Sequence, residues 1–290
     1  MTSTSSTSAA PDPMRAMLHA MWGAAAAGWA EHASFVEQRG EVVTHALLAA
    51  ARVGEGDRVL ELGCGPGAVG IAAAAAVGRS GFVVLSDVAP AMLAIAAERS
   101  AAAGLANTTT KVLDLEQVDE PDESFDVVLC REALMLVADP GLALREVRRV
   151  LRPGGRVALA VWGARERNPW LAVLLDAVSA AVGVPVPPPG VPGPFSLADV
   201  AGLRATMAGS GLADVEVREL DTPMAVESFE AWWQIVPALA GPVGSLLSSL
   251  PAEQVDAIRA AARSSIGADQ ADGRLDLPGL SLVAAGRRPA

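Results

Sequence analysis

The chain has 290 residues, enough to bury one large core together with a smaller covering unit. Its formal net charge is −11 and lysine occurs only at Lys111, so the surface repels phosphates on average and we expect no nucleic-acid partner. Hydrophobic residues make up 51% of the chain, but many are alanines. The longest apolar runs fall far short of the roughly 20 residues that a membrane span needs, so we expect no membrane segment.

Residues 1–13 are predicted to be a disordered tail, because the Ser/Thr-rich start has neither the basic segment nor the apolar run of a signal peptide. Two cysteines, Cys64 and Cys130, do not form the framework of a disulfide-rich protein. They indicate a reducing compartment, and we expect a cytoplasmic location.

Residues 14–56 are predicted to form an N-terminal helical lid. An interrupted helix is expected over Met14–Val36, with Trp22 and Trp29 seven residues apart on one face, and a second helix over Glu41–Ala51.

From residue 57 to residue 162 short apolar runs alternate with helical stretches, which is typical of βαβ units around a parallel sheet. The predicted strands are Arg58–Leu62, Phe82–Ser86, Thr109–Leu113, Phe125–Cys130 and Gly155–Val161, and the predicted helices are Ala68–Val77, Pro90–Ala103 and Leu142–Leu151. In such a sheet the carboxyl ends of the strands share one edge, where ligands bind.

Residues 163–290 are predicted to complete the sheet and to carry helices on the substrate side. Two more strands, over Val215–Leu220 and Leu280–Ala285, complete an α/β, Rossmann-like fold: a seven-stranded, mostly parallel sheet with helices on both faces. The segment between those strands is too long for a hairpin and predicts a helical insertion before the last strand. The remaining expected elements are helices Asn168–Val182, Ser228–Ala238 and Pro251–Ser265, a helix opened by a capping pattern from Ser196 to Asp199, and a proline-rich loop over Pro185–Pro194.

A glycine-rich turn, Gly63-Cys64-Gly65-Pro66-Gly67, follows the first predicted strand. Glycines let the backbone turn sharply and let a ligand approach the main chain. Alone the pattern is weak, because Gly63-x-Gly65-x-x-Ala68 also satisfies the dinucleotide fingerprint and a turn without ligand is a further alternative.

Two carboxylates narrow the choice. Glu61 precedes the glycines, where it would repel a pyrophosphate and attract a ligand with an ammonium and a sulfonium. Asp87 ends the second strand, the position from which a carboxylate accepts hydrogen bonds from ribose hydroxyls. The alternative for Asp87 is a helix cap before Pro90.

Four ordered motifs resemble those of class I S-adenosylmethionine-dependent methyltransferases. The stretch from Glu61 to Gly67 looks like motif I, Asp87-Val88-Ala89-Pro90-Ala91-Met92-Leu93 like the second-strand motif, Asp114-Leu115-Glu116 with residues 121–129 like the adenine-side motif and fourth strand, and Arg152-Pro153-Gly154-Gly155 like the turn into the fifth strand. Together they cover residues 57–162 and are similar to the ubiquinone/menaquinone-biosynthesis-like branch, also called type 11.

The resemblance implies S-adenosylmethionine as cofactor and a set of binding residues. They are Glu61, Gly63, Cys64, Gly65 and Gly67 for the methionine part, Asp87 for the ribose, Val88 and Met92 beside the adenine with Asp114 and Leu115 at its edge, and Cys130 and Arg131 near the methionine end. Many relatives have a tyrosine near the cofactor; this chain has none, and only Trp22 and Trp29 could replace it. For both, packing of a lid helix is the alternative.

The acceptor is predicted to be a small, apolar or aromatic metabolite, bound by the N-terminal helices, residues 162–194 and the insertion with Trp232 and Trp233. A general base is needed only for some acceptors, and the candidates are His19, His32 and Glu132. For the histidines a packing or surface role is the alternative, and Glu132 could instead pair with Arg131 or Arg145. No metal site is predicted, and a monomer or homodimer is expected.

Other functions on the same fold are a nicotinamide-dependent oxidoreductase and a non-catalytic S-adenosylmethionine-binding regulator. A short-chain dehydrogenase would need a catalytic tyrosine, which the chain lacks. A nucleic-acid amino-methyltransferase would need an Asn/Asp-Pro-Pro-aromatic sequence where the chain has Cys130-Arg131-Glu132-Ala133.

Overall fold

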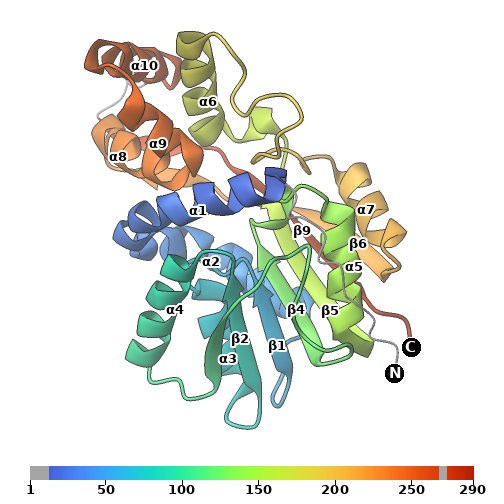
Figure 1. Cartoon of the computed structure of the whole chain (residues 1–290). Helices are drawn as coiled ribbons and strands as arrows, with labels where there is room; N and C mark the ends of the chain where they lie inside the picture. The colour runs from blue at the N-terminus through green and yellow to red at the C-terminus, as the bar shows by residue number, and fades with distance from the viewer. Residues whose placement is uncertain (1–12, 268–272) are drawn as a thin grey trace, which may run out of the picture.

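The computed structural model describes residues 13–267 and 273–290. Its centre is a seven-stranded sheet in the order β3-β2-β1-β4-β5-β9-β6 (Figure 1). The strands are β1 Arg58–Leu62, β2 Phe82–Asp87, β3 Thr108–Val112, β4 Phe125–Arg131, β5 Leu151–Trp162, β6 Ala213–Asp221 and β9 Leu280–Arg287. Strand β9 is antiparallel to both neighbours and the other pairs are parallel, which confirms the predicted mostly parallel sheet. The predicted tail lies outside the described residues except for Pro13.

Side chains of the central strands alternate between two hydrophobic cores, one on each face of the sheet. Val59 packs with α2 Ala33–Ala50, α3 Ala68–Val77 and α4 Pro90–Ala102, whereas its neighbour Leu60 packs on the face covered by α5 Pro140–Val150 and α7 Val200–Gly209. Both strand residues are fully buried, as expected for a sheet covered on both sides.

The N-terminal segment forms α1 Pro13–Glu31 and α2, separated at His32. The interruption expected within Met14–Val36 lies at His32, whereas the predicted start of the second helix at Glu41 is wrong, because α2 begins at Ala33 and runs through Gly40. Gly40 is needed there, since a Cβ at this position would lie 2.3 Å from Nη1 of Arg131. Helix α1 crosses the carboxyl edge of the sheet (Figure 1) and packs on α4 through Ala26 and Met92.

Four helices gather beyond the same edge (Figure 1), and we call them the helical roof. They are α6 Pro169–Val182, α8 Phe229–Leu239, α9 Pro242–Ser249 and α10 Ala252–Ser265. The predicted insertion before the last strand is present, but two of its parts were not predicted: α9, and a ribbon in which β7 Met224–Val226 pairs with β8 Leu275–Leu277. None of the helices in the described part of the chain combines the length and apolar character that crossing a bilayer requires.

One predicted helix start is wrong. Ser196 was expected to open a helix, but α7 begins at Val200 and is capped by Asp199, which accepts a hydrogen bond from the amide of Gly202. The Ser196 hydroxyl instead accepts from the amide of Gly193, at 2.8 Å, inside the preceding loop. Asp is as good a cap as Ser, so the pattern alone could not choose between them.

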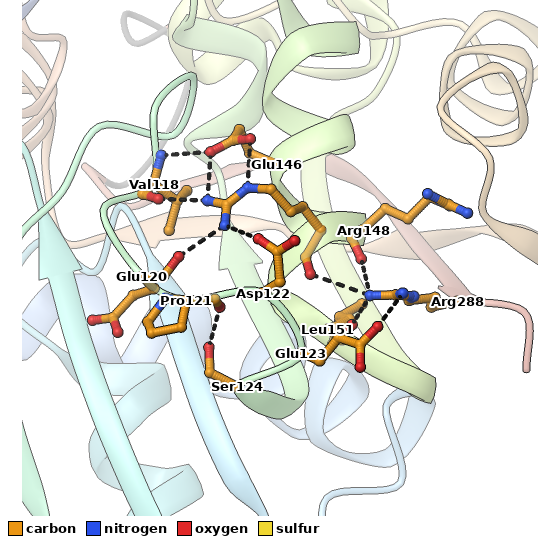
Figure 2. A network of polar contacts seen from close by, with 11 residues as sticks. Val118, Glu120, Pro121, Asp122, Glu123, Ser124, Glu146, Arg148, Leu151 and Arg288 are labelled. Carbon is orange, nitrogen blue, oxygen red and sulfur yellow. Dashed lines mark hydrogen bonds and ion pairs between the residues drawn. The ribbon is translucent and has the colours of Figure 1, made fainter. Parts of the chain in front are cut away.

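A polar network fixes the segment between β3 and β4 (Figure 2). Arg149 of α5 donates to the carbonyls of Val118 and Glu120, at 2.6 and 2.8 Å, while Glu146 accepts from the amide of Val118 at 2.9 Å. Hydrogen bonding to Arg149 lowers the pKa of Glu146 below its ordinary value. The network therefore holds in place the segment that begins at Asp114, one of the predicted site residues.

Candidate functional site

A cavity of about 580 Å³ lies at the carboxyl edge of the sheet, bordered by α1, α2 and three helices of the helical roof, α6, α8 and α9. We call one part the acidic half; it is lined by Glu61, Gly63, Cys64, Gly65, Asp87, Val88, Met92, Asp114, Leu115 and Glu116. The apolar half is lined mainly by Phe35, Leu136, Trp162, Trp170, Leu171, Leu175, Met224, Val236, Leu239, Val243, Leu246 and the prolines of residues 185–194, together with Arg39. Ten of the twelve residues predicted to bind cofactor line this cavity; Gly67 and Cys130 do not.

The glycine loop bends in a way that only glycine adopts readily. Gly63, Gly65 and Gly67 have φ of +64°, +50° and +85°. A Cβ on Gly63 would lie 2.4 Å from the Cβ of Ala133, whereas one on Gly67 would press on Ala96 at 3.0 Å. Gly63 thus lets the turn lie close against Ala133, and Gly67 allows α3 to start close against α4.

Glu61 lies beneath the loop rather than freely inside the cavity. Its side chain is buried, and Oε2 accepts a hydrogen bond from the amide of Gly70 in α3 at 2.7 Å. Burial raises the pKa of Glu61 to about 8, against the lowering effect of the nearby Arg131 charge and the Gly70 bond. A positively charged ligand would stabilise the ionised form of this carboxyl group.

Asp87 joins β2 to the glycine loop. Oδ2 accepts from the amide of Gly65 and Oδ1 from the amide of Ala89, both at 2.9 Å. The residue at the N-cap of α4 is Ala89, so Asp87 is not the cap that was the alternative interpretation. Burial raises the pKa of Asp87. Each carboxylate oxygen accepts one hydrogen bond from a backbone amide, so each can accept a further hydrogen bond from a ligand hydroxyl.

Asp114 is held by α1, a contact that the sequence did not indicate. Arg15 forms an ion pair with Asp114, with Nε 3.1 Å from Oδ2, and Nε2 of His19 lies 3.3 Å from the same oxygen. Arg15 is also 3.7 Å from Glu116. These contacts attach the N-terminal helix over the acidic half, beside Leu115.

The end of β4 places two predicted residues differently. Cys130 is buried among the core side chains of the α5 face, and burial raises the pKa of its thiol to about 12. Arg131 lines the cavity and donates from Nη1 to the hydroxyl of Thr44 at 3.0 Å and to the carbonyl of Gly40 at 3.3 Å. Its guanidinium therefore ties α2 to the sheet edge.

The three base candidates differ in position. Glu132 lines the cavity and has φ of +59°, a conformation rare outside glycine and common at functional sites. Burial raises its pKa, opposed by the charges of Arg131 and Arg39. Arg145, the other partner considered, pairs with Asp139 instead. His19 lines the cavity beside Asp114, whereas His32 lies at the break between α1 and α2 and is not a lining residue.

The two tryptophans of the insertion were expected to line the cavity, but neither of them does. Trp22, Trp29, Trp162 and Trp170 line it. Trp232 is fully buried below it, where its Nε1 donates to the carbonyl of Trp170 at 2.9 Å, and Trp233 packs on Phe229. The insertion therefore supports the apolar half through packing and does not present these two rings to it.

Arg39 of α2 is a site residue that sequence reasoning missed. Its guanidinium carbon lies 4.2 Å from the ring centre of Trp170 and 4.8 Å from that of Trp162, and Nη2 donates to the carbonyl of Thr222 at 3.2 Å. Burial lowers the pKa of Arg39 to about 10. No motif marked this residue, because its surroundings come from segments far apart in the chain.

Comparison with known proteins agrees with this geometry. Residues 54–177, which carry the glycine loop, Asp87 and Asp114, match the family model described as methyltransferase domain. This part of the chain is therefore similar to methyltransferase domains. Its curated relatives of the methyltransferase family include the ubiquinone/menaquinone biosynthesis C-methyltransferase of Cellvibrio japonicus, 34% identical over 133 residues that cover 46% of this chain and 53% of the relative. The matched part is thus similar to the ubiquinone/menaquinone-biosynthesis-like branch that the motifs indicated.

A second curated relative and a solved structure are also similar to this chain. Aklanonic acid methyltransferase of Streptomyces is 38% identical over 103 residues, 36% of this chain and 47% of that protein. The YcgJ protein of Bacillus subtilis has the same fold, with a TM-score of 0.58 at 19% identity over 87% of this chain and 99% of that one. The chain thus spans about half the length of the curated relatives it matches.

Proposed function

We propose that the chain transfers a methyl group from S-adenosylmethionine to a small apolar or aromatic metabolite. The division of the cavity carries this proposal: carboxylates beside an open glycine loop at one end, and an apolar, tryptophan-lined space at the other. The carboxylates suit a cofactor with an ammonium, a sulfonium and a ribose, and they oppose the pyrophosphate of a dinucleotide.

The residues of the acidic half fit that cofactor. Gly63 has no Cβ that would fill the space toward Ala133, and Asp87 has acceptor capacity left for hydroxyls. We place the amino-acid part beside Glu61 and the glycines and the ribose on Asp87. The adenine then lies among Val88, Met92 and Leu115, which line the cavity in the same region.

When bound, the cofactor supplies a methyl group on a positively charged sulfur, already activated for in-line displacement. The chain has to align the acceptor and exclude water. The contacts of Arg15 and His19 with Asp114 hold α1 over the acidic half. Helices α6, α8 and α9 and the rings of Trp162 and Trp170 cover the apolar half. Both arrangements keep solvent away from the reacting atoms.

For an acceptor that must lose a proton, we propose Glu132 as the general base. It lines the cavity at the end of β4, between the two halves, and burial raises its pKa toward the range in which a carboxylate accepts protons efficiently. His19 is engaged with Asp114, and His32 does not reach the cavity lining.

The acceptor class follows from the lining and has support from relatives. The matched relatives are named for ubiquinone/menaquinone biosynthesis and for aklanonic acid, which supports a small-molecule acceptor for this chain too. The net charge of −11 opposes a nucleic-acid acceptor. A reducing, cytoplasmic compartment is part of the same proposal, since Cys64 and Cys130 are both free and buried. The expectation of a monomer or homodimer stays a prediction.

The test has two stages. In thermal-shift measurements, S-adenosylhomocysteine should stabilise the chain and NAD should not, because the latter brings a pyrophosphate to Glu61 and Asp87. A panel of phenols, aromatic acids and quinol analogues is then screened for release of S-adenosylhomocysteine. Stabilisation by NAD alone would support the oxidoreductase alternative. Cofactor binding without turnover across a broad panel would support the regulator.

A further inference from the structure

We propose that Arg39 is the recognition group for an acidic oxygen, a carboxylate or phenolate, on an otherwise apolar acceptor. The inference rests on the proposed methyl transfer and names the acceptor class of that site. Its basis is a guanidinium that lines the cavity while most of its hydrogen-bonding groups have no partner in the described part of the chain.

An arginine side chain carries about five N–H donors in a planar fork. Among residues 13–267 and 273–290, Arg39 makes one hydrogen bond, from Nη2 to the carbonyl of Thr222 at 3.2 Å. Its Nε is buried without a partner in the same part of the chain. A buried charge with few hydrogen-bond partners is costly. Burial lowers the pKa of Arg39 to about 10, although the charge of Glu132 acts in the opposite direction. Because Nε has no accessible surface, an anionic ligand atom would bind at the remaining N–H groups and offset the cost of burying the charge.

The guanidinium is held in a fixed plane, as a recognition group requires. The rings of Trp162 and Trp170 contact each other edge to face, with centres 5.1 Å apart, and Arg39 lies over both. Arginine stacks on aromatic faces while its edge keeps the donors available for a bidentate carboxylate. The Nη1 group makes no hydrogen bond within the described residues, so this edge is free to bind the acceptor.

The position of Arg39 separates it from the cofactor. Glu61 and Asp87 belong to β1 and β2, whereas Arg39 contacts Trp162 at the end of β5 and Thr222 after β6. Strand β5 is two places from β1, roughly 10 Å across the sheet at the usual spacing. The other arginine near β1, Arg131, is already bonded to Thr44 and Gly40 of α2.

Glu132 lies in the electrostatic field of Arg39 and completes the arrangement. If the acceptor brings its oxygen with a proton, Glu132 can accept the proton while Arg39 stabilises the resulting anion. If the oxygen arrives ionised, Arg39 binds it directly. In both cases the remaining surface of the acceptor lies against apolar side chains such as Leu171, Leu175 and Val243.

The experiment compares a charged probe with a neutral one of the same shape. Affinities of 2-naphthoate and 2-naphthamide are measured by calorimetry, with and without saturating S-adenosylhomocysteine, for the full chain and three variants. The wild type should prefer naphthoate by at least about tenfold, the scale of one desolvated charge-assisted hydrogen bond. Arg39→Leu should abolish the preference, and Arg39→Lys should keep part of it, since lysine lacks the fork.

Arg165→Leu is the matched control, because Arg165 also lies over a ring, that of Phe195, but does not line the cavity. Arg165→Leu should leave the preference for naphthoate unchanged.

The inference is overturned if the wild type shows no preference for naphthoate, or if Arg39→Leu retains the preference. If Arg39→Leu fails to fold, an unchanged preference in Arg39→Lys overturns the inference in the same way. If Arg39→Leu loses S-adenosylhomocysteine affinity while the naphthoate preference persists, Arg39 belongs to the cofactor and the inference is again wrong. Failure of the wild type to bind S-adenosylhomocysteine would instead refute the proposed function, and the probe comparison without cofactor would still judge Arg39.

Discussion

The two halves of the cavity are built differently. In the acidic half, Glu61 and Asp87 bond to backbone amides of the same strand–helix–strand unit and its exit: Glu61 to Gly70, and Asp87 to Gly65 and Ala89. In the apolar half, Arg39 of α2 contacts the ring of Trp162 at the end of β5, the ring of Trp170 at the start of α6, and a carbonyl after β6. The first half depends on local chain geometry and the second on packing between distant segments. Substitutions should therefore affect cofactor binding and acceptor recognition separately.

The largest expected effect comes from the glycine loop. Gly63→Ala should lower the free energy of unfolding by about 3 kcal/mol, because a left-handed conformation and a clash with Ala133 act together. Binding of S-adenosylhomocysteine should be lost as well. Urea denaturation and calorimetry measure the two effects.

Gly104→Ala is a matched control for this substitution. Gly104 also has a positive φ, +71°, but nothing lies within 4 Å of the position its Cβ would take. Only the backbone cost should remain, about 1 kcal/mol. Equal losses in the two variants would show that Gly63 has no special packing role.

The next largest effect is expected from Glu132, which lies between the two halves of the cavity. Glu132→Gln should reduce kcat by roughly 100-fold, the lower range for loss of general-base catalysis, without changing S-adenosylhomocysteine affinity. In the wild type, activity should fall as the pH decreases through the raised pKa of Glu132, because the protonated carboxyl group cannot accept a proton. The variant should lack this acidic limb. An unchanged kcat would exclude Glu132 as the base.

Asp87→Ala should act on the cofactor half alone. The affinity for S-adenosylhomocysteine should weaken by about 1–3 kcal/mol, the scale of lost hydrogen bonds to a charged group. The variant also loses the bonds to Gly65 and Ala89, so Asp87→Asn, which keeps part of them, should lose less. Asp256→Ala, an exposed change in α10, is the control for calorimetry. Unchanged affinity in Asp87→Ala would refute the ribose assignment.

The same difference between halves explains what the sequence could predict. Strand–helix alternation and the glycine loop are local patterns, so the seven-stranded sheet and most of the acidic half could be predicted residue by residue. The bonds of Asp87 to Gly65 and Ala89 stay within one strand–helix–strand unit and its exit, which makes such a motif recognisable in the sequence. The unpredicted contact of Arg15 with Asp114 shows the limit, because it joins residues 99 positions apart.

For the apolar half, the sequence predicted which segments contribute apolar and aromatic residues, but not which of these side chains line the cavity. Tryptophans pointed to the correct segments, but Trp232 and Trp233 lie outside the cavity lining while Trp162 and Trp170 line it. Whether a tryptophan ring faces the core or the cavity depends on how α6 and α8 pack. The hydrophobic periodicity of the sequence does not specify this packing. Arg39 carried no signal for the same reason: its stacking partners are brought to it by the tertiary fold.

The smallest effect, and the one that examines the acidic half most directly, is the pH dependence of cofactor binding. Burial raises the pKa of Glu61 to about 8, so at pH 6 to 7 the free carboxyl group carries a proton. Arg131 lowers this pKa and Asp87 raises it, and a cationic cofactor would lower it further. Binding should then release a proton, and affinity should rise with pH until about 8 and level off above. Glu61→Gln removes this linkage, so the affinity of the variant for the cofactor should depend on pH less steeply than that of the wild type. At the acidic end, the two slopes should differ by up to about tenfold in affinity per pH unit. The cofactor's own amino group titrates in both proteins and cancels in the comparison. Calorimetry in buffers of different ionisation enthalpy counts the protons; identical slopes for the two proteins would mean that Glu61 is not the group that responds to the cofactor's charge.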